Sequence, residues 1–159
     1  MNHRVGIVVP TLGERSEYLE QCLNSIRSAG DSHILLVAPK SLDTESLKSE
    51  GLIDSAVADP RNGLPAAINL GIKSLPESVE YVNWLGDDDL LSPDALNTAT
   101  KTLDSKEDIS MVFGACDYID SHGKVVWKNF SGQWAVPLLR FGPDLIPQPG
   151  ALFRRSAFN

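Results

Sequence analysis

Three consecutive aspartates, Asp87, Asp88 and Asp89, are the residues of this sequence best suited to do chemistry. At a separation of about 6 Å and an effective dielectric near 20, two ionised carboxylates repel each other by roughly 3 kcal/mol. A triplet therefore needs a cation, hydrogen-bond donors or raised pKa values. A hard divalent ion bound by carboxylate oxygens, phosphate oxygens and water would meet that need. The triplet predicts a cation site, and a solvated acidic turn is the alternative interpretation.

Several other uses of an acidic segment are excluded by the neighbouring residues. Leu90 and Leu91 follow the triplet directly, which excludes the alternating acids of an EF-hand calcium loop. Ser92 is expected to cap the next helix, with Pro93 at its first position, so helix capping explains little. Residues 10–15 lack the GxGxxG of dinucleotide-binding domains and the acidic pair of a response-regulator receiver, and no GK[ST] sequence marks a P-loop.

The triplet follows the last of four strand-like segments, which alternate with helix-like segments along the chain. The expected strands are residues 5–9, 34–37, 53–58 and 81–85, and the expected helices are residues 16–27, 43–48, 65–74 and 92–103. The first two strands are continuous apolar runs, which are typical of strands buried on both faces. Alternation of this kind predicts an α/β fold with a mostly parallel sheet flanked by helices.

Polar side chains follow three of the four expected strands. Thr11 comes after the first strand, Arg61, Asn62 and Gly63 come after the third, and the acidic triplet comes after the fourth. Ligand sites in open α/β sheets form at the carboxyl ends of the parallel strands. We therefore expect these residues to meet at one edge of the sheet.

The pattern changes after residue 105. Residues 111–119 and 124–130 read as two strands joined by a turn at residues 121–123, which predicts a C-terminal β-hairpin. A short strand is expected at residues 151–153, and residues 156–159 resemble the first turn of a helix. We therefore expect residues 1–159 to form a single domain that is incomplete at its C-terminus.

Charge and composition narrow the class of protein. The net charge is −7 and no basic cluster interrupts it, so nucleic acid is an unsuitable partner. No segment approaches the roughly 20 apolar residues of a membrane-spanning helix, and no signal peptide is recognisable. We expect a cytoplasmic protein, with peripheral attachment to a membrane left open. Cys22 and Cys116 stand outside any CxxC pair, so the cysteines indicate neither a zinc site nor a redox site.

Four segments of the chain, taken in order, resemble the inverting, nucleotide-sugar-dependent glycosyltransferases of the GT-A fold, often called family-two glycosyltransferases. They are residues 5–11, 62–71, 84–96 and 148–158, and the third is similar to the DxD region of that family. The resemblance implies a GT-A (Rossmann-like, nucleotide-diphospho-sugar transferase) fold. It also implies transfer of a sugar from a nucleotide-diphospho-sugar donor to the hydroxyl of an unknown saccharide or lipid-linked acceptor.

The resemblance also implies roles for individual residues. The expected donor-binding residues are Thr11, Arg61, Asn62, Gly63 and Asp87. The expected ligands of Mn²⁺ or Mg²⁺ are Asp88 and Asp89, and the expected acceptor side is Gln148, Pro149 and Gly150. Purely structural explanations stand beside these, because Gly63 suits a turn before a helix and Arg61 suits a charged surface.

Three departures from the family pattern carry consequences. Residues 38–41 replace an acidic segment that helps to bind the nucleobase, which leaves the nucleobase open. Gly86 replaces the first aspartate of the common DxDD pattern, so the metal-binding role is expected to rest on the triplet. The general base of the family lies beyond the last matched segment, so the catalytic base is unknown.

Two alternatives to an active transferase follow. The first is a catalytically incomplete or degenerate domain that binds a nucleotide-sugar without transferring it. The second is a nucleotidyltransferase of the same fold, which ranks lower because it needs a Gly-rich basic loop and only Gly13 and Arg15 are available. An incomplete domain would also expose apolar surface, through which two copies could form a homo-oligomer.

Overall fold

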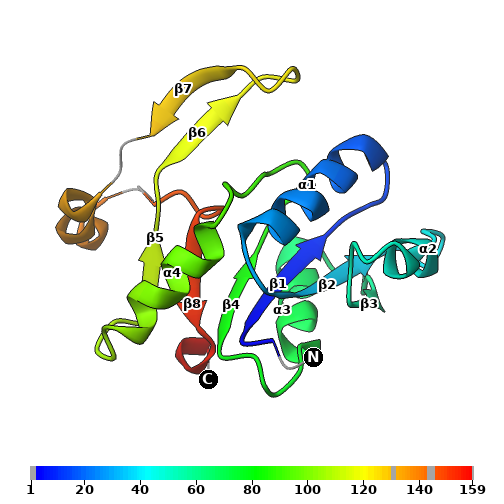
Figure 1. Ribbon diagram of the computed structural model, residues 1–159, viewed down its shortest axis with the longest axis horizontal. Coiled ribbons are helices and arrows are strands. Elements are labelled where there is room, and N and C mark those ends of the chain that lie inside the picture. Colours follow the sequence, from blue (N-terminus) through cyan, green and yellow to red (C-terminus); the bar gives the residue numbers. More distant parts are fainter. Residues whose placement is uncertain (1–2, 130–131, 143–145, 159) are drawn as a thin grey trace.

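The computed structural model describes residues 3–129, 132–142 and 146–158, and in these ranges six strands form the main sheet (Figure 1). The strands, in their order across the sheet, are β3 (Ser55–Ala58), β2 (His33–Ala38), β1 (Val5–Pro10), β4 (Tyr81–Trp84), β8 (Ala151–Arg154) and β5 (Met111–Phe113). The first four run parallel, and β8 is antiparallel to both β4 and β5. The predicted mostly parallel sheet is confirmed.

Different helices cover the two faces of this sheet (Figure 1). The helices are α1 (Ser16–Ala29), α2 (Thr44–Ser49), α3 (Leu64–Ser74) and α4 (Ala95–Asp104). Leu23 of α1 and Leu103 of α4 share one buried cluster with Ile7 of β1. Ile72 of α3 lies in a second cluster with Val8. Because successive strand residues point to opposite faces, the apolar run of β1 supplies both clusters, as its sequence predicts.

Helix α3 lies unusually close to the sheet because Gly71 has no side chain. A Cβ atom built at this position would collide with the side chain of Val8 on β1. Close packing of this kind leaves little room for adjustment. Gly71 therefore sets the distance between α3 and the central strand.

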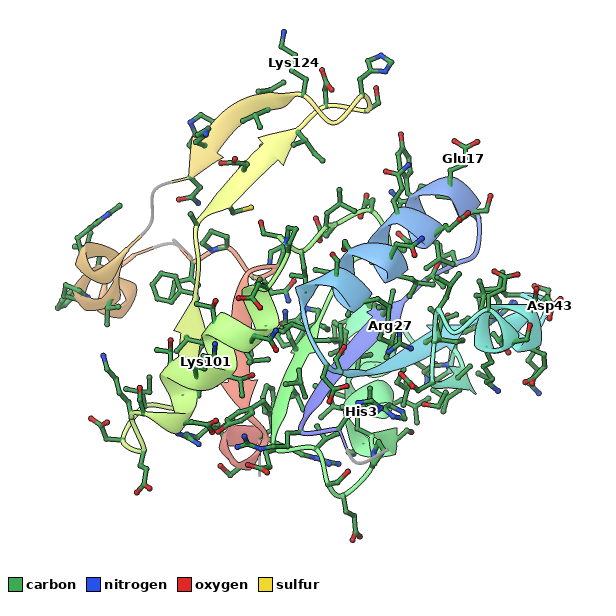
Figure 2. The ribbon with its side chains drawn as sticks, in the orientation of Figure 1. His3, Glu17, Arg27, Asp43, Lys101 and Lys124 are labelled. Carbon is green, nitrogen blue, oxygen red and sulfur yellow. The ribbon has the colours of Figure 1, made fainter. Side chains whose placement is uncertain are left out.

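Arg27 ties the C-terminal part of α1 to neighbouring loops (Figure 2). Its guanidinium donates hydrogen bonds of 2.9 Å to the carbonyl of Ser32, 3.0 Å to the carbonyl of Gly51 and 2.9 Å to the carboxylate of Asp54. Asp54 in turn accepts from the backbone amide of Ile34 at the start of β2. Arg27 therefore fixes the C-terminal part of α1, while the other end of the helix, which follows Arg15, lies at the carboxyl edge of the sheet.

The predicted strand over residues 111–119 is wrong as a single element. Residues 111–113 pair with β8, whereas β6 (Cys116–Ile119) pairs with β7 (Val125–Asn129) in a separate ribbon that projects from the sheet (Figure 1). The chain leaves the sheet at Gly114, whose amide donates to the carbonyl of Gly150 at 3.1 Å. The predicted hairpin turn is confirmed, with Gly123 at a φ of 77° and Lys124 directly before β7 (Figure 2). Residue 130 lies outside the described residues.

The predicted cap of the fourth helix is also wrong. Helix α4 begins at Ala95 and follows Asp94, whose φ is 62°, so Ser92 and Pro93 lie in the preceding turn. The amide of Asp94 donates to the carbonyl of Ser28 in α1 at 3.2 Å, and this contact holds the turn out of helical geometry.

Two 3₁₀ helices complete the described chain. They are η1 (Gln133–Arg140) and η2 (Arg155–Phe158). The second forms where the sequence predicts the first turn of a helix, although residue 159 lies outside the described residues. Within the ranges that the structure describes, no helix is both long and apolar enough to span a membrane.

Candidate functional site

The predicted site residues lie at one edge of the sheet, where the parallel strands end. Thr11 directly follows β1, the acidic triplet follows β4, and residues 61–63 follow β3. Strand β8 is antiparallel to β4, so residues 148–150, which precede β8, lie beside the segment that follows β4. The topology therefore brings together segments more than 130 residues apart in sequence, as the strand-end rule predicts.

Thr11 and Asp87 form a buried pair between the ends of β1 and β4. The hydroxyl of Thr11 donates to Oδ2 of Asp87 at 2.5 Å, and each residue is 6% exposed. The amide of Gly13 donates to the same hydroxyl oxygen at 3.0 Å. A hydroxyl that both donates and accepts has its orientation fixed. The pair therefore places the first carboxylate of the triplet at a defined position.

Arg15 bridges the first two carboxylates of the triplet, and its part in the site is absent from the sequence prediction. Its Nη2 donates to Oδ1 of Asp87, and its Nη1 donates to Oδ2 of Asp88, both at 2.5 Å. The side chain of Arg15 is 48% exposed. The signal that could have found it is the need of the triplet for a cation, since Arg15 lies in the loop after β1, the strand next to β4.

Asp88 and Asp89 converge above Gly86. Oδ1 of Asp88 and Oδ2 of Asp89 lie 3.1 and 2.9 Å from the point where a Cβ atom of residue 86 would stand. Burial, and then the charge of Asp88, raises the pKa of Asp89 above its ordinary value. These two oxygens share a space that any larger residue at position 86 would fill. The absence of a side chain at Gly86 thus creates a small carboxylate cradle.

The two carboxylates of this cradle fit a divalent cation whose other coordination positions are filled by a bound substrate and water. Within the described residues, no three His, Cys, Asp or Glu side chains are grouped to hold a metal ion by themselves. Mg²⁺ is commonly bound by one or two carboxylates, with substrate phosphates and water completing its shell. Asp88 and Asp89 supply that number of carboxylates.

The loop after β3 forms hydrogen bonds of its own, separate from those of the triplet. Arg61 has a φ of 56°, and its amide donates to the carboxylate of Asp59 at 2.9 Å. Gly63, with a φ of 86°, precedes the first turn of α3. Arg61 and Lys40 line an open hollow of about 460 Å³ between the ends of β2 and β3. No hydrogen bond or ion pair among the described side chains joins residues 61–63 to the triplet.

Asn83 anchors the predicted acceptor-side segment and is also absent from the sequence prediction. This fully buried residue of β4 accepts a 2.9 Å hydrogen bond from Nε2 of Gln148 and donates one of 3.2 Å to the carbonyl of Pro149. The same Nε2 donates to the carbonyl of Trp84 at 2.5 Å. Both amide hydrogens of Gln148 are therefore used to position its own segment. A single Asn within an apolar strand is the signal that could have revealed this.

The sequence profile of glycosyl transferase family 2 matches residues 6–159. The chain belongs to glycosyl transferase family 2. The resemblance drawn from the four sequence segments is thereby confirmed, as is the expected class of protein, a glycosyltransferase. A comparison with curated proteins found no match.

Solved structures share the fold of this family 2 domain at low identity. S. aureus TarS 1-349 is 15% identical, with a TM-score of 0.65 over 96% of this chain and 47% of that chain. The mannosyltransferase PcManGT from Pyrobaculum calidifontis, in complex with GDP-Man and Mn²⁺, is 21% identical, with a TM-score of 0.58 over 71% of this chain and 35% of that chain. The 4-diphosphocytidyl-2C-methyl-D-erythritol synthase of Anaerococcus prevotii DSM 20548 is 16% identical, with a TM-score of 0.55 over 98% of this chain and 72% of that chain.

These likenesses confirm the predicted GT-A fold, and the chain spans about half the length of TarS 1-349. They also show that one fold serves proteins with different names, so fold alone does not separate a transferase from a synthase. Family membership is what favours the transferase over the nucleotidyltransferase alternative.

Cys22 of the family 2 domain has a structural role beneath the triplet. Its buried thiol donates a weak hydrogen bond to the carbonyl of Gly86 at 3.4 Å. Burial, and then the charge of Asp89, raises the pKa of this thiol to about 12. A thiol that stays protonated at neutral pH is a poor nucleophile and a poor metal ligand. Cys22 therefore packs as a small buried hydrophobic residue.

Proposed function

We propose that this domain binds a nucleotide-diphospho-sugar through a divalent cation and transfers the sugar to an acceptor hydroxyl with inversion at the anomeric carbon. The observation that carries the proposal is the convergence of Asp88 and Asp89 above Gly86, next to the buried pair of Thr11 and Asp87. This arrangement lies at the strand edge where α/β domains bind ligands. Membership of glycosyl transferase family 2 supplies the reaction class.

The residues at this edge have separate tasks in the proposal. Thr11 and Asp87 contact the nucleoside, and Asp88 and Asp89 hold Mn²⁺ or Mg²⁺. When bound, the cation neutralises the diphosphate and stabilises the leaving nucleoside diphosphate. PcManGT, a solved structure of the same fold, is described in complex with GDP-Man and Mn²⁺, which supports a donor and a cation of these classes.

The nucleobase is proposed to lie towards the hollow at the ends of β2 and β3. Arg61 lines this hollow, and Asn62 and Gly63 continue the same loop. Lys40 stands where the family more often has acidic residues, and among the described residues its ammonium group has no ion-pair partner. Asp59 also lines the hollow, so two cationic side chains stand beside one carboxylate. This excess of positive charge favours the carbonyl oxygens of a nucleobase or a donor phosphate over a cationic ligand.

The acceptor is proposed to approach residues 148–150. Asn83 holds Gln148 and Pro149 rigidly against β4, so the segment can form a fixed wall beside the sugar. The attacking hydroxyl must lose its proton to a base. The family resemblance implies that this base is a carboxylate. We assign no base within residues 1–159, and we propose that these residues form one domain.

Donor binding without transfer is the second candidate function. It is favoured by the hydrogen bonds that tie Asp87 and Asp88 to Arg15. Under this alternative the domain binds the nucleotide-sugar but does not transfer the sugar, so an experiment would detect binding alone.

A thermal-shift panel of UDP-, GDP- and dTDP-sugars, with and without Mn²⁺, tests the proposal. A donor at a hundredfold excess over its dissociation constant stabilises the folded state by about 2.7 kcal/mol, which is easily detected. We expect one donor to stabilise the protein only with Mn²⁺, and Asp88→Ala to abolish the effect. Donor hydrolysis or transfer in the same samples separates the enzyme from the binding domain. A panel with no Mn²⁺-dependent shift would overturn both candidates.

A further inference from the structure

Two arginines bridge pairs of carboxylates at opposite ends of the same two strands. Arg4 lies just before β1 and donates to Glu80 at 2.9 and 3.0 Å and to Asp104 at 3.0 and 2.8 Å. Arg15 lies beyond the other end of β1 and donates to Asp87 and Asp88. The two side chains are 47% and 48% exposed. They are therefore matched in charge, exposure and type of partner.

The two arginines differ in how completely they are engaged. The guanidinium of Arg4 makes four hydrogen bonds to carboxylates, and the hydroxyl of Tyr81 adds one of 2.6 Å to Asp104. Arg15 makes two, one to each carboxylate. A guanidinium has five N–H donors, so Arg15 retains donors for a further anion.

A divalent cation would compete with Arg15 for one of its two partners, Asp88. Asp88 is a proposed ligand of the divalent cation through Oδ1, whereas Arg15 binds its Oδ2. A carboxylate that shares its charge with a guanidinium offers less negative charge to a metal ion. A dication placed beside Asp88 would also repel the guanidinium. Cation binding and the bridge of Arg15 to Asp88 therefore oppose each other.

We infer that Arg15 serves as the counter-ion of Asp87 and Asp88 while the donor is absent, and that it binds the donor diphosphate once a divalent cation binds Asp88 and replaces Arg15 as its counter-ion. The planar fork of a guanidinium matches two phosphate oxygens, and charge-assisted bonds to phosphate are strong. Arg15 is exposed and precedes α1, so its side chain can turn without disturbing the core. This inference rests on the proposed function and adds a diphosphate-binding residue to it.

The inference predicts that one substitution, Arg15→Ala, changes the affinity for Mn²⁺ and the affinity for a nucleotide in opposite directions. Arg15→Ala removes the competitor for Asp88, so Mn²⁺ should bind more tightly in the absence of a nucleotide. The same change removes a partner of the diphosphate, so a nucleoside diphosphate should bind more weakly at saturating Mn²⁺. A merely structural role in the loop would weaken both, because the carboxylates would lose their arrangement.

Mn²⁺ titrations followed by electron paramagnetic resonance measure the affinity for Mn²⁺ in the absence of a nucleotide. Calorimetry with UDP, GDP and dTDP at saturating Mn²⁺ measures the affinity for the nucleotide. For Arg15→Ala we expect Mn²⁺ alone to bind several-fold more tightly, and the nucleotide that wild type prefers to bind roughly tenfold more weakly. Arg4→Ala is the matched control, since it removes the same charge at the other end of β1 and should change neither affinity.

The possible results separate this inference from the proposed function. If wild type binds Mn²⁺ and a nucleotide, but Arg15→Ala changes both affinities in the same direction or neither, the inference is wrong and the proposed function stands. If wild type binds neither probe, both fail. Arg15→Lys guards against misfolding, because it keeps the charge but loses the fork; it should weaken nucleotide binding, and unchanged nucleotide binding would also overturn the inference.

Discussion

The hydroxyl of Thr11 donates a 2.5 Å hydrogen bond to the carboxylate of Asp87, which lies 76 residues further along the chain. Both side chains are buried, so the bond is shielded from water. A buried carboxylate is stable when donors surround it, and here Thr11 and Arg15 provide them. The pair links the ends of β1 and β4 and defines where the candidate site begins.

Replacing Thr11 with valine should destabilise the domain. The substitution keeps the shape of the side chain but leaves Oδ2 of Asp87 without its hydroxyl donor, which typically costs about 1–3 kcal/mol. Urea denaturation measures the change in the free energy of unfolding. Thr98→Val is the matched control, because Thr98 is exposed on α4, and its effect should stay within about 0.5 kcal/mol. Equal effects of the two substitutions would show that the Thr11 bond contributes nothing.

Replacing Asp88 with asparagine should abolish Mn²⁺ binding with little change in folding. Asp88 is half exposed and its Oδ1 faces the cradle above Gly86, so the amide removes charge from the site and leaves the core intact. Calorimetric titration with MnCl₂ provides the measurement, and Asp108→Asn, an exposed aspartate elsewhere, is the control. Retention of Mn²⁺ binding in Asp88→Asn would place the cation elsewhere.

Asp104→Asn should lower the free energy of unfolding above about pH 4, and the difference from wild type should disappear in stronger acid. Hydrogen bonds from Arg4, and then from Tyr81, hold the pKa of Asp104 at about 2, below its ordinary value of 3.8. The folded state therefore binds this proton less readily than the unfolded chain. Its stabilising effect is full above pH 3.8 and disappears as the pH falls towards 2. Because the carboxylate is 41% exposed, the effect should be about 1 kcal/mol or less.

Unfolding midpoints of wild type and Asp104→Asn between pH 2 and pH 7 give the comparison. The two curves should separate at neutral pH and meet near pH 2. Asp108→Asn serves as the control and should follow wild type throughout. A gap between wild type and Asp104→Asn that stayed constant down to pH 2 would contradict the ion-pair explanation.

Gly71→Ala should destabilise the domain by about 1–3 kcal/mol, although alanine is the better helix former. The added methyl group would collide with Val8, so α3 must move away from β1. Asn69→Ala in the same helix, where the side chain is exposed, should be neutral or slightly stabilising. Chemical denaturation of both variants gives the comparison. A stable Gly71→Ala variant would mean that α3 packs further from the sheet.

The order of strands and helices could be predicted from the sequence because the signals are local. Continuous apolar runs such as residues 34–37 specify buried strands, and helical spacing of apolar residues specifies the helices between them. A parallel sheet then brings all carboxyl strand ends to one edge, so the positions of Thr11 and the acidic triplet followed from order alone.

The α/β order, the edge of the sheet that carries the candidate site and the family pattern can thus all be read from the amino-acid sequence. The bridge from Arg15 to Asp87 and Asp88, the contact of Asn83 with Gln148 and the start of α4 at Ala95 become visible only in the folded chain. One cause accounts for all three. These features depend on hydrogen bonds between segments distant in sequence, whose partners become neighbours only after the sheet and its helices have packed.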